Sequence, residues 1–285
     1  MSYSNILVPI NIYENYHHIL NSAEQIAHKY NASLTLLMVL DTPFELVPMA
    51  NDYQKALEDE AIKALKVATE SLQIKSADTA IAAGTPHNEI IAHAKKNNND
   101  LIVLGSHGKH GVKLILGSTS NAVLHHATCD VLTVHLEEKQ AASAVKYKNI
   151  VISTDMSPDN DSLIETGKSI AEKFNATLNA INVQSDPAVV VSTYGIAPDM
   201  HTEIFEQAKK QLQGWATSHG ITGEAKCAMG NSSQEVINYA NELDDSLIVV
   251  GSHHKSAIGR FFLGSTANAI LHYAKQDVLV VKLKN

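Results

Sequence analysis

The chain has 285 residues, with 22 Lys and Arg against 30 Asp and Glu, and 45% of its residues are hydrophobic. This composition excludes disordered and fibrous proteins, and the net charge of −8 disfavours partners such as nucleic acid or an anionic membrane surface. No segment approaches the ~20 apolar residues of a membrane span, and the opening residues do not resemble a signal peptide. We therefore expect a cytoplasmic protein that binds neither nucleic acid nor membranes.

Short apolar runs alternate with segments of helical period along the whole chain. The runs predict strands near residues 5–10, 33–40, 77–82, 100–104, 130–135, 149–154, 177–183, 224–229, 245–250 and 277–282. Between them, helix starts are indicated at Thr85-Pro86, Ser157-Pro158 and Asn231, and the helix near 53–72 carries Ala56, Ile62, Leu65 and Leu72 to cover a sheet. This alternation predicts an α/β fold with a parallel sheet covered on both faces.

The second half of the chain repeats the first at a nearly constant offset. Tyr3 to Val8 recurs as Tyr147 to Ile152, Tyr30 to Leu34 as Phe174 to Leu178, Leu101 to His107 as Leu247 to His253, and Gly117 to Thr119 as Gly264 to Thr266. A repeat over the full length predicts two copies of one folding unit. We expect a first domain at 1–136, a linker at 137–146 and a second domain at 147–285.

Glycines and hydroxyl residues follow the fourth predicted strand of each copy. The first copy has Gly105 and Gly108, then Gly117, Ser118 and Thr119 at the start of a helix; the second has Gly251, then Gly264, Ser265 and Thr266. Ligands of open parallel sheets bind beyond the carboxyl ends of the strands, and a glycine-rich loop leading into a helix presents N–H groups to phosphate. The hydroxyls could instead only cap the helix.

These residues resemble the universal stress protein family, in its tandem form with two domains in one chain. Nucleotide-binding members carry G-x2-G-x9-G-[ST] after strand four and an Asp at the end of strand one. Both copies also end in a similar segment that begins with His and closes with V-L-x-V, at His125 to Val134 and His272 to Val281. The resemblance implies two Rossmann-like domains, each a five-stranded parallel sheet in the order 3-2-1-4-5. It further implies that the final strands pair the two domains, and it is compatible with a homodimer.

The resemblance also implies a ligand, ATP or ADP or AMP, with Mg as a possible companion. Adenine would be held by Asp155 and the main chain of Val183 in the second copy, and by the main chain of Val39 in the first. Thr154 would belong to the same nucleotide site as Asp155. Each copy departs from the pattern: Asn11 replaces the Asp and eight residues separate Gly108 from Gly117, whereas His254 replaces the second glycine of the other copy. The Asn11 amide can still bond to an adenine edge, so we expect both sites to bind. Because Asn11 lacks the charge of Asp155, we expect the second site to bind more tightly.

The sequence also contains residues that could belong to a metal site or an enzyme active site. His107, His110, His253 and His254 lie in the glycine loops without the i, i+4 spacing of a helical metal site, so no metal site is predicted. P-loop and G-x-G-x-x-G motifs are absent, and so is any nucleophile–base or paired-carboxylate pattern. We therefore predict no catalytic residue, and at most a very slow ATPase.

Two alternatives stay open at this stage. Asp155 could serve only to form the turn before Ser157-Pro158, and Lys109 and Lys255 could either neutralise phosphate or lie solvated on the surface. The protein is accordingly expected to be a regulatory nucleotide-binding protein. The alternative is a stress-response scaffold whose degenerate sites hold another small ligand or none.

Overall fold

The computed structural model describes residues 2–11, 16–41, 50–74, 77–106, 116–135, 147–185, 198–252 and 263–283, with the backbone alone at 50–54 and 198–201. The chain divides into two compact units, Ser2–Val145 and Lys146–Asn285, the latter together with Met1. Each unit is described by itself. The predicted linker at 137–146 lies outside the described residues, so its boundaries and the pairing of the domains stay predictions.

The first domain is a parallel five-stranded sheet. Its elements are β1 (Asn5–Ile10), α1 (His17–Tyr30), β2 (Ser33–Leu40), α2 (Ala50–Glu70), β3 (Ala77–Ala83), α3 (Pro86–Lys96), β4 (Leu101–Ser106), α4 (Ser118–His126) and β5 (Asp130–His135). The strands run in the order β3-β2-β1-β4-β5, and every neighbouring pair is parallel. The predicted fold class, strand positions and strand order are confirmed for this domain.

The second domain repeats this arrangement. Its elements are β6 (Asn149–Ser153), the 3₁₀ turn η1 (Pro158–Asn160), α5 (Asp161–Phe174), β7 (Thr177–Gln184), α7 (Pro198–Ser218), β8 (Ala225–Met229), α8 (Ser232–Glu242), β9 (Ser246–Ser252), α9 (Ser265–Tyr273) and β10 (Asp277–Lys282). The strand order is β8-β7-β6-β9-β10, again parallel throughout. The duplication that the sequence predicted is therefore a duplication of the fold.

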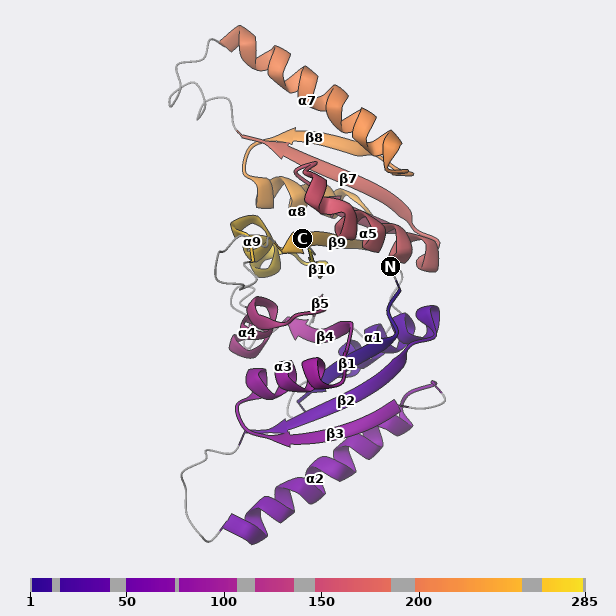
Figure 1. Cartoon of the computed structure of the whole chain (residues 1–285), viewed down its shortest axis with the longest axis vertical. Coiled ribbons are helices and arrows are strands. Elements are labelled where there is room, and N and C mark those ends of the chain that lie inside the picture. Colours follow the sequence, from indigo (N-terminus) through magenta and orange to yellow (C-terminus); the bar gives the residue numbers. More distant parts are fainter. Residues whose placement is uncertain are drawn as a thin grey trace. The chain divides into compact units, whose positions relative to one another are not determined.

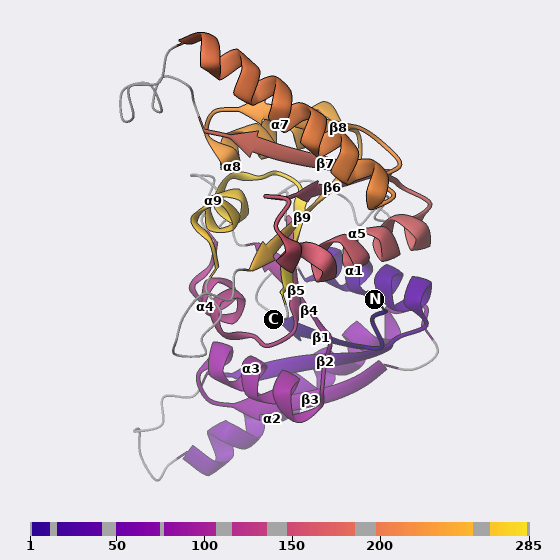
Figure 2. The same cartoon turned by 45° about the horizontal axis from the view of Figure 1, so that its top comes forward.

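Helices cover both faces of each sheet, as Figures 1 and 2 show. Strand order reverses between β1 and β4, so right-handed crossovers send α1 and α2 to one face and α3 and α4 to the other. In agreement, α3 packs against α4, and α8 packs against α9 in the second domain. The central strands are buried on both sides: Ile6, Leu7 and Val8 of β1 have no exposed surface. This explains why these strands read as continuous apolar runs.

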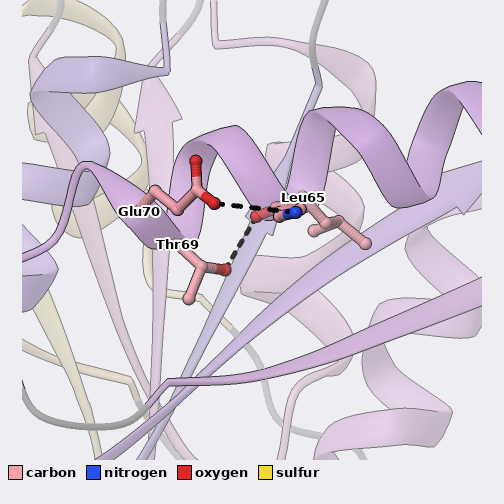
Figure 3. Close-up of polar contacts among 4 residues, drawn as sticks. Leu65, Thr69 and Glu70 are labelled. Carbon is pink, nitrogen blue, oxygen red and sulfur yellow. Dashed lines mark hydrogen bonds and ion pairs between the residues drawn. The ribbon is translucent and has the colours of Figure 1, made fainter.

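Helix α2 covers β2 and β3 with a different stripe from the predicted one. Ala61, Leu65 and Ala68 are buried, whereas Ile62 is 55% exposed and Ala56 is also exposed. The spacing of Ala61, Leu65 and Ala68, at i, i+4 and i+7, keeps the buried stripe on one side of the helix. Figure 3 shows the end of this helix, where the Thr69 hydroxyl donates to the Leu65 carbonyl at 2.7 Å.

Residues that mark the repeat in the sequence hold the start of each sheet together. The Tyr3 hydroxyl donates to Asp130 Oδ2 at 2.8 Å, and the Tyr147 hydroxyl donates to Asp277 Oδ2 at 2.6 Å. Burial raises the pKa of both tyrosines well above the usual value, and the neighbouring carboxylates raise it further. In each domain the pair joins a residue two positions before the first strand to the first residue of the last strand.

The turns after the first helix of each domain also repeat. Asn31 ends α1 and Asn175 ends α5, both in the left-handed conformation with φ of 54°. Asparagine is one of the few residues that adopts this conformation at low cost, which explains the recurring Asn-Ala pair. Of the predicted helix starts, Asn231 accepts a hydrogen bond from the Gln234 N–H at 3.1 Å, whereas the side chain of Thr85 makes no capping bond.

No helix in the described part of the chain is both long and apolar enough to cross a membrane.

Candidate functional site

A cavity of about 500 Å³ lies at the carboxyl edge of the first sheet. Its lining comes from the ends of β1, β2 and β4, the first turns of α1, α3 and α4, and the middle of α2. The lining residues are Pro9, Ile10, Asn11, Tyr16, Ile19, Leu37, Met38, Val39, Leu40, Asp41, Leu57, Glu60, Ala61, Pro86, Ile90, Leu104, Gly105, Thr119 and Ser120. Strand order reverses at this edge, which is where ligands of doubly wound sheets bind.

The wall of this first cavity is mostly apolar. Ile10 and Met38 are buried side chains at the ends of neighbouring strands, and Tyr16 stands half-buried before α1. The carboxylates of Asp41 and Glu60 belong to exposed residues of the same lining. A cavity with an apolar wall and a few polar groups suits a flat ring with polar edges and hydroxyl substituents.

The first turn of α4 is fixed to the end of β4. The Ser120 hydroxyl, on a buried side chain, donates to the Gly105 carbonyl at 3.0 Å. Gly117 is the N-cap with φ of −60°, a value open to any residue, so backbone conformation does not require a glycine there. The N–H groups of the first helical turn have no intrahelical partner and point out of the helix end. The turn thus has the chemistry expected of a phosphate site.

The second domain has a smaller cavity, of about 210 Å³, at the matching edge. All seven residues that the sequence predicted for this copy line it: Thr154, Asp155, Val183, Gly251, Gly264, Ser265 and Thr266. They come from the ends of β6, β7 and β9 and the beginning of α9. The fold therefore brings together residues that lie more than a hundred positions apart in the sequence.

Polar side chains beside this second cavity bond to one another. Asn160 Nδ2 donates to Thr154 Oγ1 at 3.0 Å and to Asp155 Oδ1 at 2.7 Å. Asn182 Nδ2 donates to the Thr154 carbonyl at 2.8 Å, and Asn182 Oδ1 accepts from the side chain of Gln184. We call Thr154, Asp155, Asn160 and Asn182 the polar network. Three of its members, Thr154, Asn160 and Asn182, are buried.

Asp155 also shapes the turn that leads into α5. Its Oδ1 accepts from the Ser157 N–H at 3.0 Å, the hydrogen bond of an Asx turn. The intervening Met156 has φ of 60°, and its N–H donates to Thr154 Oγ1 at 2.9 Å. The turn-forming role that the sequence left open for Asp155 is therefore present in the structure, and the same side chain lines the cavity.

Of the residues predicted for the first copy, Val39, Gly105 and Thr119 line the larger cavity together with Asn11. Gly117 and Ser118 begin the same helical turn without lining the cavity. Gly108 and Lys109 lie outside the described residues, as do His107, His110, His253, His254 and Lys255. Among the residues that the structure describes, no group of three His, Cys, Asp or Glu side chains is placed to hold a metal ion.

Sequence reasoning missed the residues that make the two cavities different. Leu57, Glu60 and Ala61 reach the first cavity from α2, which the sequence treated only as a cover for the sheet. Asn182 was also missed, although an asparagine inside an otherwise apolar strand is unfavourable and could have drawn notice. Asn160 gave no comparable signal, because asparagine is common in turns before helices.

Each half of the chain combines a doubly wound α/β sheet with a cavity at the carboxyl edge where strand order reverses. Each half is therefore a Rossmann-like domain with a cavity where ligands of such sheets bind. The sequence profile described as the universal stress protein family matches residues 2–135 and again residues 146–282. The chain belongs to the universal stress protein family and carries two of its domains in tandem.

Relatives and solved structures agree with this assignment. Universal stress protein A homolog 1 of Coxiella burnetii is 34% identical over 144 residues, which span 48% of this chain and 100% of that protein. A universal stress protein of Mycobacterium tuberculosis is 22% identical over 258 residues, covering 90% of this chain and 86% of the relative. The structure of a universal stress protein from Archaeoglobus fulgidus matches with a TM-score of 0.73 at 18% identity, over 100% of both chains. At that identity the structural match shows the fold.

Proposed function

We propose that this chain is a regulatory protein that binds an adenine nucleotide, ATP or ADP or AMP, with little or no hydrolysis. The observation that carries the proposal is the cavity of about 500 Å³ at the switch point of a doubly wound sheet, within the 300–1,000 Å³ typical of ligand pockets. Its lining joins Val39, Gly105 and Thr119, three of the residues that the family motif assigns to nucleotide.

The chemistry of the lining supports this ligand. Buried Ile10 and Met38 offer apolar surface for the faces of a purine ring, and the side-chain amide of Asn11 can both donate to and accept from its edge. Asp41 and Glu60 can accept from ribose hydroxyls, as carboxylates do in dinucleotide-binding folds. The first turn of α4 supplies N–H groups for phosphate. Mg²⁺, if it accompanies the nucleotide, would be held through the phosphates.

Mass spectrometry of the purified, denatured protein provides the first test. Release of ATP, ADP or AMP is the expected result. Calorimetry of the stripped protein should then show binding of adenine nucleotides and weaker binding of GTP, which carries a different pattern of donors and acceptors on its base edge. Phosphate release from ATP should stay close to the uncatalysed rate. Absence of binding by any adenine nucleotide would favour the scaffold alternative.

A further inference from the structure

We propose that the first domain alone binds the nucleotide. In the second domain, the polar network takes the place that the nucleotide has in the first. This inference rests on the proposed function and assigns it to one of two homologous sites. It reverses the expectation from sequence, in which Asp155 made the second site the tighter one.

The sizes of the two cavities provide the first argument. The cavity of the first domain is about 500 Å³ and that of the second about 210 Å³, although both lie at the carboxyl edge of sheets with the same strand order. Pockets for cofactors and drug-sized ligands usually span roughly 300–1,000 Å³. The first cavity falls inside this range and the second falls below it.

The side chains at three aligned positions also differ in kind between the two cavities. The 144-residue repeat aligns Thr154, Asn160 and Asn182 with Ile10, Tyr16 and Met38 of the first domain. In the second domain these three polar residues are all buried and bond to one another or to the adjoining backbone. The aligned residues of the first domain are two aliphatic side chains and a half-buried tyrosine around an open cavity.

Binding in the second domain would have to disturb this network. The Asp155 carboxylate that would accept from adenine already accepts from Asn160 Nδ2 at 2.7 Å and from the Ser157 N–H at 3.0 Å. A purine that displaced Asn160 would break the hydrogen bonds from the buried Asn160 amide to Thr154 and Asp155, which is unfavourable. At the aligned positions of the first domain, Ile10 and Met38 present carbon and sulfur atoms, which lose no hydrogen bond on contact with the ring.

The junction between the loop and the helix that follows the fourth strand also favours binding in the first domain. In the first domain the Ser120 hydroxyl fixes α4 to the Gly105 carbonyl at 3.0 Å. The aligned residue of the second domain is Ala267, which has no hydroxyl to make this bond. The N-terminal turn of α4 is therefore held in place before a phosphate arrives, and such preorganisation favours binding.

The test uses the full chain and ATP, with calorimetry and hydrogen exchange measured by mass spectrometry. We expect one ATP per chain. Slower amide exchange on ATP addition should occur at residues 36–41, 102–106 and 118–124 of the first domain. The matching segments 180–185, 248–252 and 265–271 serve as the internal control and should exchange at unchanged rates.

The variant Thr119→Trp places a large ring in the first cavity from a half-buried position in the first turn of α4. It should weaken ATP binding at least tenfold, with far-UV circular dichroism unchanged. If that variant does not fold, Met38→Asn tests the same wall and should weaken binding in the same way. Two ATP per chain, protection in the second-domain segments, or full affinity in the folded variants would overturn the inference while leaving the proposed function intact. Absence of binding by ATP, ADP and AMP alike in the parent chain would overturn both.

Discussion

Asn160 is the residue on which the polar network of the second domain depends, since its amide joins Thr154 to Asp155. We expect Asn160→Ala to destabilise the protein by about 1–3 kcal/mol, the usual cost of leaving buried polar groups without partners. Urea unfolding measures this change. Asn238→Ala is the matched control, because Asn238 accepts from Gln234 on the exposed face of α8 at 2.8 Å and its loss should cost below about 0.5 kcal/mol. Equal effects of the two variants would show that the network adds no stability.

The left-handed residue Asn175 offers a second test at the residue scale. An alanine at φ of 54° is strained, so Asn175→Ala should lower stability by about 1–2 kcal/mol. Asn175→Gly should be nearly neutral, because glycine adopts this conformation without a steric cost. Thermal unfolding of the two variants separates the conformational effect from loss of the amide. If Asn175→Gly is as unstable as Asn175→Ala, the side-chain amide matters more than the backbone angle.

At the scale of elements, the hydrogen bond from Tyr3 to Asp130 ties the segment just before β1 to the first residue of β5. Hydrogen bonds to charged acceptors contribute roughly 1.5–3 kcal/mol, so Tyr3→Phe should destabilise the first domain by about that amount. Tyr147→Phe removes the matching bond to Asp277 and provides the comparison in the second domain. Hydrogen exchange of peptides from each domain assigns the loss. A Tyr3→Phe protein as stable as the parent would contradict this role.

The same tyrosines predict how stability depends on pH. Their pKa in the folded protein is raised above that of an unfolded tyrosine, which is about 10. The stability that they contribute is therefore fully present below pH ~10 and is lost as the pH rises through and above that value, because the unfolded chain releases the protons first. Denaturation measured from pH 8 to 11 should show this decline. The decline should be shallower for the double variant Tyr3→Phe, Tyr147→Phe, by up to about 1.4 kcal/mol per pH unit for each tyrosine.

At the scale of the whole molecule, each half has a sheet, a set of helices and a buried core of its own. We therefore expect the fragments 1–136 and 147–285 each to fold alone, with cooperative thermal unfolding and mixed α/β circular dichroism. ATP at about 100 times its dissociation constant should stabilise the first fragment by about 2.7 kcal/mol and leave the second unchanged. A fragment that stays unfolded would show that its core depends on the rest of the chain.

The sequence by itself determined the duplication, the strands and the fold class. These depend on local features: apolar runs of strand length, glycine and asparagine at turns, and a repeat that any pairwise comparison of the two halves detects. It also named seven of the residues that line the cavity of the second domain, because the family resemblance assigns residues that follow the carboxyl ends of its strands. Order within the sheets followed from the family resemblance, since periodicity alone does not set which strands pair.

The tertiary structure alone decided how the two sites differ. Asn182 meets Thr154 across 28 residues of sequence, and Asn160 meets both Thr154 and Asp155 only because the turn before α5 folds back over the strand end. Leu57 and Ala61 reach the first cavity because α2 packs over β2. Whether a polar residue points into a cavity or pairs with a neighbour depends on the positions of several elements at once. No spacing along the chain encodes those positions. The sequence therefore ranked the second site first, whereas we propose that the first site binds the nucleotide.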